Sequence, residues 1–364
     1  MRPVNEAELA EMVRAARGPL LIKGGGTRKI GRVHPGIVLE TSGLSGINLY
    51  EPGALTMVVQ AGTPLDKIEA TLANERQRLA FEVPDMRRLL QRSGSSTIGG
   101  VVAANASGPR RVQVGACRDA LLGVRFVDGT GAIVKNGGRV MKNVTGYDLV
   151  KLLAGSQGTL GVLTEVSLKV QAIPEAEVTL VAERDVGAGL ATLRAALASP
   201  FDVAGVAYLA GTAMVRIEGM AGSVAYRARQ LETVLGGAWD SVDAATSQIL
   251  WRGVRDVDAF AQRSGSVWRI AVTPTMAAQV ATKLGGEAIF DWGGGLLWLL
   301  QPSGDAASVR AAVAGIGHAT LVRGLDTMDD VAVFPPEPSA VAALSAGLRA
   351  KFDPRGILNS GIMA

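Results

Sequence analysis

The chain reads Lys23-Gly24-Gly25-Gly26-Thr27-Arg28-Lys29-Ile30-Gly31 directly after a short apolar segment, and this is the first of three glycine-rich loops. The second loop runs from Thr97-Ile98-Gly99-Gly100 to Asn105-Ala106-Ser107-Gly108, and the third is Gly155-Ser156-Gln157-Gly158-Thr159-Leu160-Gly161. Glycine lets a backbone approach a ligand closely and lets N–H groups converge on an anion. Three such loops in one small unit predict an extended, phosphate-containing cofactor rather than a single phosphate.

The first loop does not match the common nucleotide-binding fingerprints. It lacks the G-x-G-x-x-G spacing of dinucleotide-binding folds, and no G-x-x-x-x-G-K-[ST] motif of P-loop proteins occurs in the chain. Its consecutive glycines are followed by Thr27 and Arg28, which set a hydroxyl and a cation beside backbone N–H groups. A pyrophosphate suits this arrangement because its charge can be spread over several donors. The alternative for this loop taken alone is a plain turn between strands.

Composition narrows the class of protein. Of the 364 residues, 48% are hydrophobic and 19% are charged, which is a globular balance. The formal net charge of +4 comes without a basic stripe interleaved with aromatics, so nucleic-acid binding is not predicted. The single cysteine, Cys117, excludes an internal disulfide and any cysteine-held zinc or iron–sulfur centre, and fits a reducing compartment. With no apolar signal segment and no apolar stretch of spanning length, we expect a cytoplasmic protein.

Turn residues and apolar spacing divide the chain into three predicted parts. Residues 1–173 alternate strands and helices in an order typical of an α+β domain. Residues 174–330 show two β-α-β-β-α-β passes, which predict a cap domain built from a ferredoxin-like repeat laid twice into one larger sheet. Residues 331–364 hold one helix and a tail rich in Asn, Gly and Pro, predicted to pack back on the first domain.

Capping residues predict where three helices begin. Asn5 is expected to cap the first helix. Thr63 is expected to cap the second, with Pro64 at its first helical position, and Ser339 is expected to cap the last. All five tryptophans lie in the second half of the chain: Trp239, Trp251, Trp268, Trp292 and Trp298. They could pack within the protein or form an interface with a partner protein, and the sequence leaves both roles open.

The loops and further runs together resemble the vanillyl-alcohol-oxidase type of FAD-binding fold, also called PCMH-type. These further runs are Gly115-x2-Arg118-Asp119-x2-Leu122-Gly123, Lys142-Asn143-Val144-Thr145-Gly146-Tyr147-Asp148-Leu149, and Phe352-Asp353-Pro354-x3-Leu358-Asn359-x-Gly361. Ser360 stands where the family usually has proline. The resemblance covers about residues 19–172 and 339–361. Within the family the chain is most similar to the FAD-binding subunits of glycolate oxidases, on its Gly108-Pro109-Arg110-Arg111 step and its run from Val140 to Asp148.

The resemblance implies an α+β PCMH-type domain of two subdomains, a cap domain and a C-terminal helix that returns to the FAD domain. It places the FAD pyrophosphate on the first loop, Lys23, Gly24, Gly25, Gly26, Thr27 and Arg28. Further FAD contacts are implied for Pro84, Thr97, Gly99, Gly100, Asn105, Ser107, Gly108, Gly161, Val162 and, near the flavin ring, Asn359. Some relatives attach FAD covalently through a histidine in or near the first loop. Thr27 ends the glycine run here, so we expect non-covalent FAD and an ordinary loop role for His34.

The catalytic residues remain unknown from the sequence. Oxidation of a 2-hydroxy acid needs a base near the hydroxyl and a cation for the carboxylate. Larger relatives use cap-domain histidines as a base or to hold a metal, whereas this chain has only His34 and His318, in different parts, so no metal site is predicted. Polar candidates, each with a structural role as the alternative, are Tyr147, Lys142 and Arg323, with Arg252 or Arg269 as carboxylate clamps.

Three hypotheses follow. In the first and favoured hypothesis, the chain is the FAD-binding subunit of a multi-subunit glycolate oxidase, in which a larger FAD-containing subunit supplies the base and an iron–sulfur subunit takes the electrons. Alternatively it is a self-sufficient FAD-dependent oxidoreductase, or a non-catalytic assembly subunit that keeps the fold. Any membrane attachment would come through partners.

Overall fold

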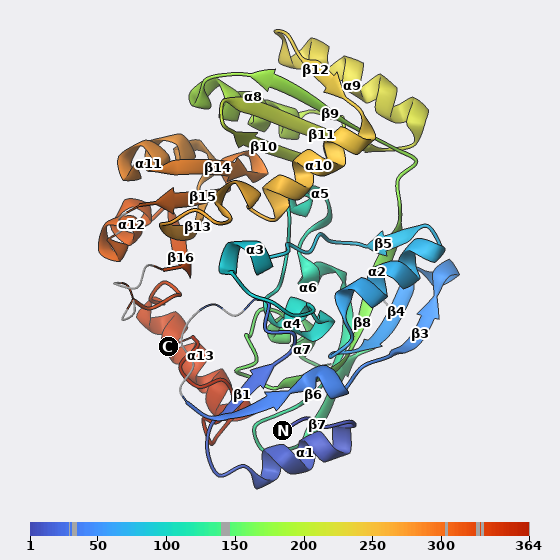
Figure 1. The fold of residues 1–364 in the computed structure, drawn as a ribbon, viewed down its shortest axis with the longest axis vertical. Coiled ribbons are helices and arrows are strands. Elements are labelled where there is room, and N and C mark those ends of the chain that lie inside the picture. The colour runs from blue at the N-terminus through green and yellow to red at the C-terminus, as the bar shows by residue number, and fades with distance from the viewer. Residues whose placement is uncertain are drawn as a thin grey trace.

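The structure is a computed structural model that describes residues 1–28, 30, 35–139, 146–302, 305–324, 328 and 331–363. It has a first domain at the blue-to-green end of the chain and a cap domain stacked on it, with the C-terminal helix beside both (Figure 1). Mixed helices and sheets confirm the α+β class. Among the described residues, no helix is long and apolar enough to cross a membrane.

The first domain contains a small subdomain and a larger one. In the small subdomain, β1 (Leu20–Lys23) pairs in parallel with β2 (Ile37–Glu40), and α1 (Glu6–Ala15) packs its Leu9 and Val13 against them. The Asn5 side chain accepts a hydrogen bond from the Glu8 N–H at 2.8 Å, so the predicted cap is confirmed. The apolar face of α1 therefore anchors the two strands that precede and follow the first glycine loop.

The larger subdomain is an antiparallel sheet in the order β3-β4-β8-β6-β7, with β5 paired to β8. Short helices bury small apolar side chains against it, and Ile68, Val101 and Leu153 are fully buried there. The strands are β3 (Ile47–Glu51), β4 (Thr56–Gln60), β5 (Gln77–Leu79), β6 (Leu121–Val127), β7 (Ile133–Gly137) and β8 (Val162–Ala172). The helices are α2 (Leu65–Asn74), α3 (Arg87–Leu90), α4 (Ile98–Ala103), α5 (Arg111–Val114), α6 (Cys117–Ala120) and α7 (Leu149–Leu153).

The cap domain is an eight-stranded antiparallel sheet in the order β12-β9-β11-β10-β14-β15-β13-β16. Each half follows a β-α-β-β-α-β path, and the halves join where β10 pairs with β14, which confirms the doubled repeat. The first half comprises β9 (Ala176–Glu183), α8 (Val186–Ala198), β10 (Gly205–Leu209), β11 (Thr212–Gly219), α9 (Ala221–Leu235) and β12 (Asp240–Val242). The second half comprises β13 (Ser266–Val272), α11 (Ala277–Leu284), β14 (Glu287–Asp291), β15 (Leu296–Gln301), α12 (Ala306–Val313) and β16 (Gly317–Arg323).

The two faces of the cap sheet have different neighbours. The helices of the repeat cover one face, and Leu193, Leu231 and Trp268 lie in that core. The other face packs on α10 (Ala244–Arg255), a connecting helix outside the predicted repeat, and on Leu89 of the first domain. This second face therefore carries the contact between the two domains.

Two predicted caps are wrong. The N-cap residue of α2 is Pro64 and not Thr63. The Thr63 hydroxyl does not cap the helix, because it donates to the Gln60 carbonyl at 2.7 Å and accepts from the Gly46 N–H at 3.0 Å. Ser339 is the first residue of α13 (Ser339–Phe352), and Pro338 precedes it without a side-chain cap.

Beyond α13 the tail returns to the first domain, where Leu358 forms a parallel bridge with Leu20. The domain boundaries at residues 173 and 330 stay predictions.

Candidate functional site

A cavity of about 700 Å³ lies where the three glycine loops meet. A volume of this size is typical of pockets that hold small molecules and cofactors. The tail reaches the cavity through Asn359 and Ile362. The predicted site residues that line the cavity are Lys23, Gly24, Gly25, Gly26, Thr27, Arg28, Thr97, Gly99, Gly100, Gly161 and Asn359.

The first loop needs glycine because it lies against the segment that precedes α4. A Cβ atom on Gly25 would stand 1.6 Å from the Ser95 carbonyl oxygen, and one on Gly24 would stand 2.3 Å from the Thr97 hydroxyl oxygen. Gly26 has a φ of +71°, which residues with a Cβ rarely adopt. The three consecutive glycines thus allow one loop to rest on another at the cavity wall.

This packing leaves backbone donors in the first loop without partners. Within the described part of the chain, the N–H groups of Gly25, Gly26 and Thr27 donate to no other group. Buried or half-buried N–H groups without acceptors are costly unless a ligand or water satisfies them. Consecutive unsatisfied donors that line a cavity fit the oxygens of a pyrophosphate.

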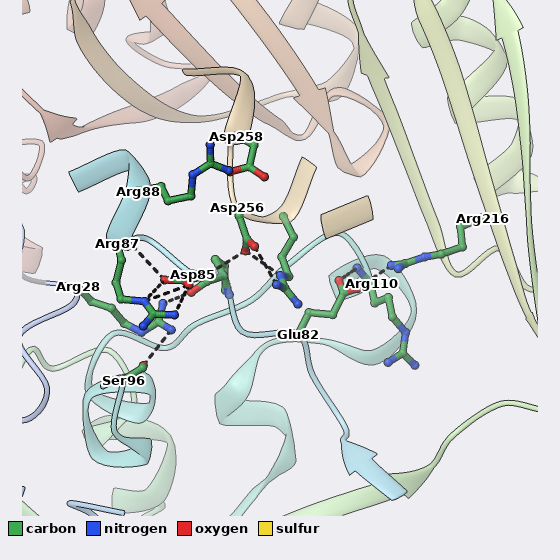
Figure 2. A network of polar contacts seen from close by, with 12 residues as sticks. Arg28, Glu82, Asp85, Arg87, Arg88, Ser96, Arg110, Arg216, Asp256 and Asp258 are labelled. Atoms are coloured by element: carbon green, nitrogen blue, oxygen red, sulfur yellow. Dashed lines mark hydrogen bonds and ion pairs between the residues drawn. The ribbon is translucent and has the colours of Figure 1, made fainter. Parts of the chain in front are cut away.

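Arg28 supplies a fixed positive charge beside these donors (Figure 2). Its guanidinium donates to the Pro84 carbonyl at 2.5 Å and to the Ser96 hydroxyl at 3.2 Å, while its buried Nε has no partner. Burial lowers the pKa of Arg28 to about 10, against the opposing pull of Asp85 and Asp256, so the side chain is still protonated at neutral pH. The residues present therefore fit an anionic group such as the FAD pyrophosphate.

The second loop is used mainly to build the wall. Thr97 caps α4 by accepting from the Gly100 N–H, and the Gly99 N–H donates to the Ala61 carbonyl at 2.7 Å. A Cβ on Gly99 would lie 2.8 Å from the same carbonyl oxygen, whereas one on Gly100 would find only an ordinary contact at 3.4 Å. Gly99 is thus required by packing, and Gly100 is the position with room on the cavity side.

Asn359 fastens the tail to two other parts of the site. Its Oδ1 accepts from the Ile22 N–H at 2.8 Å, and its Nδ2 donates to the Gln157 carbonyl at 2.7 Å. The residue is 7% exposed and has a φ of +44°, a conformation that asparagine tolerates better than most residues. Both ends of the amide are therefore occupied by protein although the residue borders the cavity.

Five predicted contact residues lie outside the cavity lining. Pro84 meets Arg28, the Asn105 side chain accepts from the Arg118 N–H at 3.0 Å, and Val162 is fully buried in β8. Ser107 and Gly108 lie at the contact with the cap, where the Gly108 carbonyl accepts from the Trp292 indole N–H at 3.1 Å. FAD contacts by these five residues stay predictions.

Comparison with known proteins identifies the family. A family model described as an FAD binding domain matches residues 1–137. The chain is 35% identical over 347 residues to the glycolate oxidase subunit GlcE of Escherichia coli strain K12, covering 95% of this chain and 92% of that protein. The chain belongs to the GlcE family. The predicted resemblance and the FAD cofactor are thereby confirmed.

Other relatives of this GlcE-family chain match mainly part of its length. The glycolate oxidase subunit GlcD of Bacillus subtilis strain 168 is 36% identical over 170 residues, covering 46% of this chain and 34% of that protein. A D-lactate dehydrogenase of Archaeoglobus fulgidus is 30% identical over 175 residues, covering 46% and 38%. A solved alkyldihydroxyacetonephosphate synthase superposes with a TM-score of 0.69 at 15% identity, covering 99% of this chain and 76% of that one, which shows the shared fold.

Further residues line the cavity of this GlcE-family chain that were not assigned as FAD contacts from the sequence. The segment Gln91 to Ser96 borders the cavity at five positions, and its Ser-Gly-Ser-Ser run directly before Thr97 is the signal that could have found it. Ser156, Gln157 and Gly158 of the third loop line the cavity as well. No aspartate, glutamate, histidine or tyrosine is among the described residues that line it.

The candidate catalytic residues of this GlcE-family chain do not gather at the cavity. Tyr147 is 89% exposed, and the Arg323 guanidinium donates to backbone carbonyls, among them Leu89 and Phe260, so its role is structural. Arg252 is exposed on α10, His318 is exposed on β16, and Lys142 and His34 lie outside the described residues. The described ranges contain no group of three His, Cys, Asp or Glu side chains that could hold a metal ion.

A line of charged contacts joins the GlcE-family cavity to the cap (Figure 2). The Asp85 N–H donates to the Asp256 carboxylate at 2.7 Å, and Arg88 pairs with Asp258 at 2.7 Å. Further along, Arg216 of β11 pairs with Glu82 at 2.9 Å. The segment that follows β5 is thus held to the cap by ion pairs and hydrogen bonds as well as by the apolar contact of Leu89.

Proposed function

We propose that this chain is the FAD-binding subunit of a multi-subunit glycolate (2-hydroxyacid) oxidase, that it holds FAD non-covalently, and that it works with a larger FAD-containing subunit and an iron–sulfur subunit. The family places it among FAD-linked oxidoreductases of 2-hydroxy acids, since its relatives bear the names glycolate oxidase subunit and D-lactate dehydrogenase. Bound FAD supplies the two-electron acceptor for oxidation of the hydroxyl-bearing carbon.

One observation carries the proposal: the described residues that line the cavity offer donors and cations but no base. Its charged lining residues in the described chain are Lys23, Arg28 and Arg92, and the unpaired N–H groups of the first loop lie beside Arg28. These groups bind and orient a diphosphate, and Asn359 holds the loops and the tail around it. Because none of the described lining side chains can accept a proton from a hydroxyl, the proposal assigns the base to the larger subunit.

Purification tests the cofactor part. The isolated chain should be yellow, and acid precipitation should release all flavin into the supernatant, because no histidine is among the described residues that line the cavity. Arg28→Met should weaken FAD binding at least tenfold, since it removes a charge-assisted contact, while Arg252→Met on the exposed face of α10 serves as the matched control. A colourless but folded chain, or flavin that stays with the precipitate, would overturn this part.

Reconstitution tests the subunit part. Glycolate-dependent dye reduction should be absent with the chain alone and should appear when the larger flavoprotein and iron–sulfur subunits are added. Full activity of the isolated chain would instead show a self-sufficient enzyme. Unchanged activity of the other two subunits when this chain is left out would show that it is not part of the oxidase.

A further inference from the structure

A second polar cluster lies between the two domains, apart from the residues that line the cavity. It consists of Arg111 from α5 in the first domain and of Arg269 from β13 and Trp292 from the turn after β14 in the cap. The guanidinium carbons of Arg111 and Arg269 stand 5.0 and 5.3 Å from the centre of the Trp292 indole ring. Two cations thus contact one aromatic ring. Each cation–π contact is favourable, but the two positive charges repel each other.

The cluster adjoins the end of the second glycine loop. The Trp292 indole N–H donates to the Gly108 carbonyl at 3.1 Å, and Arg111 donates to the Ser107 hydroxyl at 3.2 Å. In the cap sheet, Arg269 is paired with Trp298 on one side and Thr320 on the other, so these three side chains share the face toward the first domain. Residues from both domains therefore meet beside the loop expected to contact FAD.

The charges in this cluster are not balanced. In the described structure neither Arg111 nor Arg269 has an ion pair, and the Arg269 guanidinium has no hydrogen-bond partner. Other arginines at the same domain contact are paired, Arg216 with Glu82 at 2.9 Å and Arg110 with Glu218 at 3.3 Å. The fold thus pairs these neighbouring interfacial cations with carboxylates, whereas Arg111 and Arg269 have no ion pair among the described residues.

Two carboxyl groups lie near the cluster, and neither forms an ion pair with it. Asp119, near Arg111, pairs with Arg118 at 3.9 Å, and Asp291 lies near Arg269. Asp291 is 2% exposed, and its Oδ1 accepts from the Trp292 N–H at 2.7 Å. Burial raises the pKa of Asp291 to about 8, so it is mostly neutral at pH 7. Burial and the neighbouring Arg111 lower the pKa of Arg269 to about 10, which leaves it charged. Partly buried cations without counter-charges are costly, and an anionic ligand would relieve that cost.

We propose that Arg111, Arg269 and Trp292 form a binding site for the carboxylate of a small organic acid at the contact between the domains. The planar guanidinium forks match the two oxygens of a carboxylate, and both guanidinium groups lie against the same indole ring. The inference rests on the proposed function, because the 2-hydroxy acid of the oxidase is the acid in question. It goes beyond that function by giving this subunit, which has no base in its described cavity lining, its own contact with substrate or product.

Calorimetry on the FAD-loaded full chain tests the site. The probe is oxalate, a two-carbon diacid without a hydroxyl to oxidise, and inorganic phosphate is the second anion. Oxalate should bind the wild type, Arg111→Met and Arg269→Met should each weaken binding at least tenfold, and Arg269→Lys should weaken it less. Arg252→Met, which removes an exposed cap arginine, should bind as the wild type does. Bound flavin and the melting temperature show whether each variant is folded.

Each outcome decides a separate point. Absence of oxalate binding by the wild type, or unchanged binding by Arg269→Met and Arg111→Met, would overturn the site. Phosphate binding as tightly as oxalate would overturn its assignment to a carboxylate. If FAD is retained and the reconstituted complex oxidises glycolate while oxalate fails to bind, only this inference falls. If oxalate binds as expected but the complex shows no glycolate oxidation, only the proposed function falls.

Discussion

Replacing Asn359 by alanine tests whether the C-terminal tail holds the cofactor site together or only touches the cofactor. In the structure both ends of its amide are used, by the Ile22 N–H at 2.8 Å and the Gln157 carbonyl at 2.7 Å. Truncation leaves both backbone groups unsatisfied, at about 1–3 kcal/mol each. We take the lower half of that range, about 2–4 kcal/mol in total, because the residue borders a cavity that water can enter.

The backbone adds a further cost. Asn359 has a φ of +44°, where alanine is disfavoured by about 1 kcal/mol more than asparagine. The expected loss of unfolding free energy is therefore about 3–5 kcal/mol, a large part of the 5–15 kcal/mol that usually stabilises a folded domain. Asn359→Asp keeps the acceptor for Ile22 and loses only the donor to Gln157, so it should cost about half as much.

Urea unfolding of the FAD-free protein measures this loss. Far-ultraviolet circular dichroism follows both domains, whereas tryptophan fluorescence follows mainly the cap, because all five tryptophans lie between residues 239 and 298 and Trp292 also contacts Gly108 of the first domain. We expect the dichroism midpoint to fall markedly and the fluorescence midpoint to fall less. Normal stability of the FAD-free Asn359→Ala variant, combined with weakened FAD binding, would refute the reasoning and would show that Asn359 acts on FAD directly.

Four further predictions follow from single contacts. Gly100→Asp should weaken FAD binding at least tenfold in a flavin fluorescence titration while Gly100→Ala binds normally, since a Cβ there meets only an ordinary contact at 3.4 Å; equal binding by both would contradict the placement of the diphosphate. The stability that protonated Asp291 contributes is complete below its unfolded pKa of 3.8 and is lost as the pH rises through its folded pKa of about 8. The unfolding free energy of Asp291→Asn should therefore equal that of the wild type near pH 4 and exceed it by on the order of 5 kcal/mol above pH 8. Equal urea midpoints at pH 9 would count against this. Glu218→Gln should cost about 3–5 kcal/mol in thermal unfolding, because it leaves buried Arg110 and Arg216 without that carboxylate; a loss below about 1 kcal/mol would show that water or rearrangement replaces it. Cys117 is fully buried, which raises the pKa of its thiol, so maleimide should label it only after unfolding; rapid labelling of the native protein would contradict this.

The glycine loops and the doubled cap repeat could be predicted because their signals are local. Three glycine-rich loops bounded by apolar segments indicate a diphosphate site without knowledge of the tertiary structure. The β-α-β-β-α-β order can be read from turn residues and apolar spacing. The helix α10 could not be predicted from that order, since it is an insertion between the two passes. Thr63 shows the same limit on a smaller scale, because its hydroxyl accepts from the N–H of Gly46, which lies 17 residues earlier and is brought near only by the folded chain.

Which cavity residues touch the ligand and which only support the wall depends on contacts between distant segments. Gly99 and Gly100 are adjacent and identical, yet the first packs on Ala61, whereas a Cβ on the second would meet only the Thr97 hydroxyl oxygen at 3.4 Å. Asn359 belongs to a recognisable tail motif, but its partners Ile22 and Gln157 are more than 200 residues away. Arg269 stands between Trp268 and Ile270, so alternation predicts that it points away from their core, but not that its face meets another domain.

The unsatisfied groups at the cavity and at the Trp292 cluster have one property in common. The N–H groups of the first loop, the Nε of Arg28, and the guanidinium of Arg269 are all donors. Such groups bind anions tightly but cannot take a proton from a hydroxyl. The carboxyl groups near the cluster do not change this, because Asp291 is mostly protonated at neutral pH and Glu82 is paired with Arg216. A chain whose described cavity lining suits an anionic cofactor but offers no base fits the proposal that the proton acceptor comes from a partner subunit. Reconstitution with the larger flavoprotein is therefore the decisive experiment.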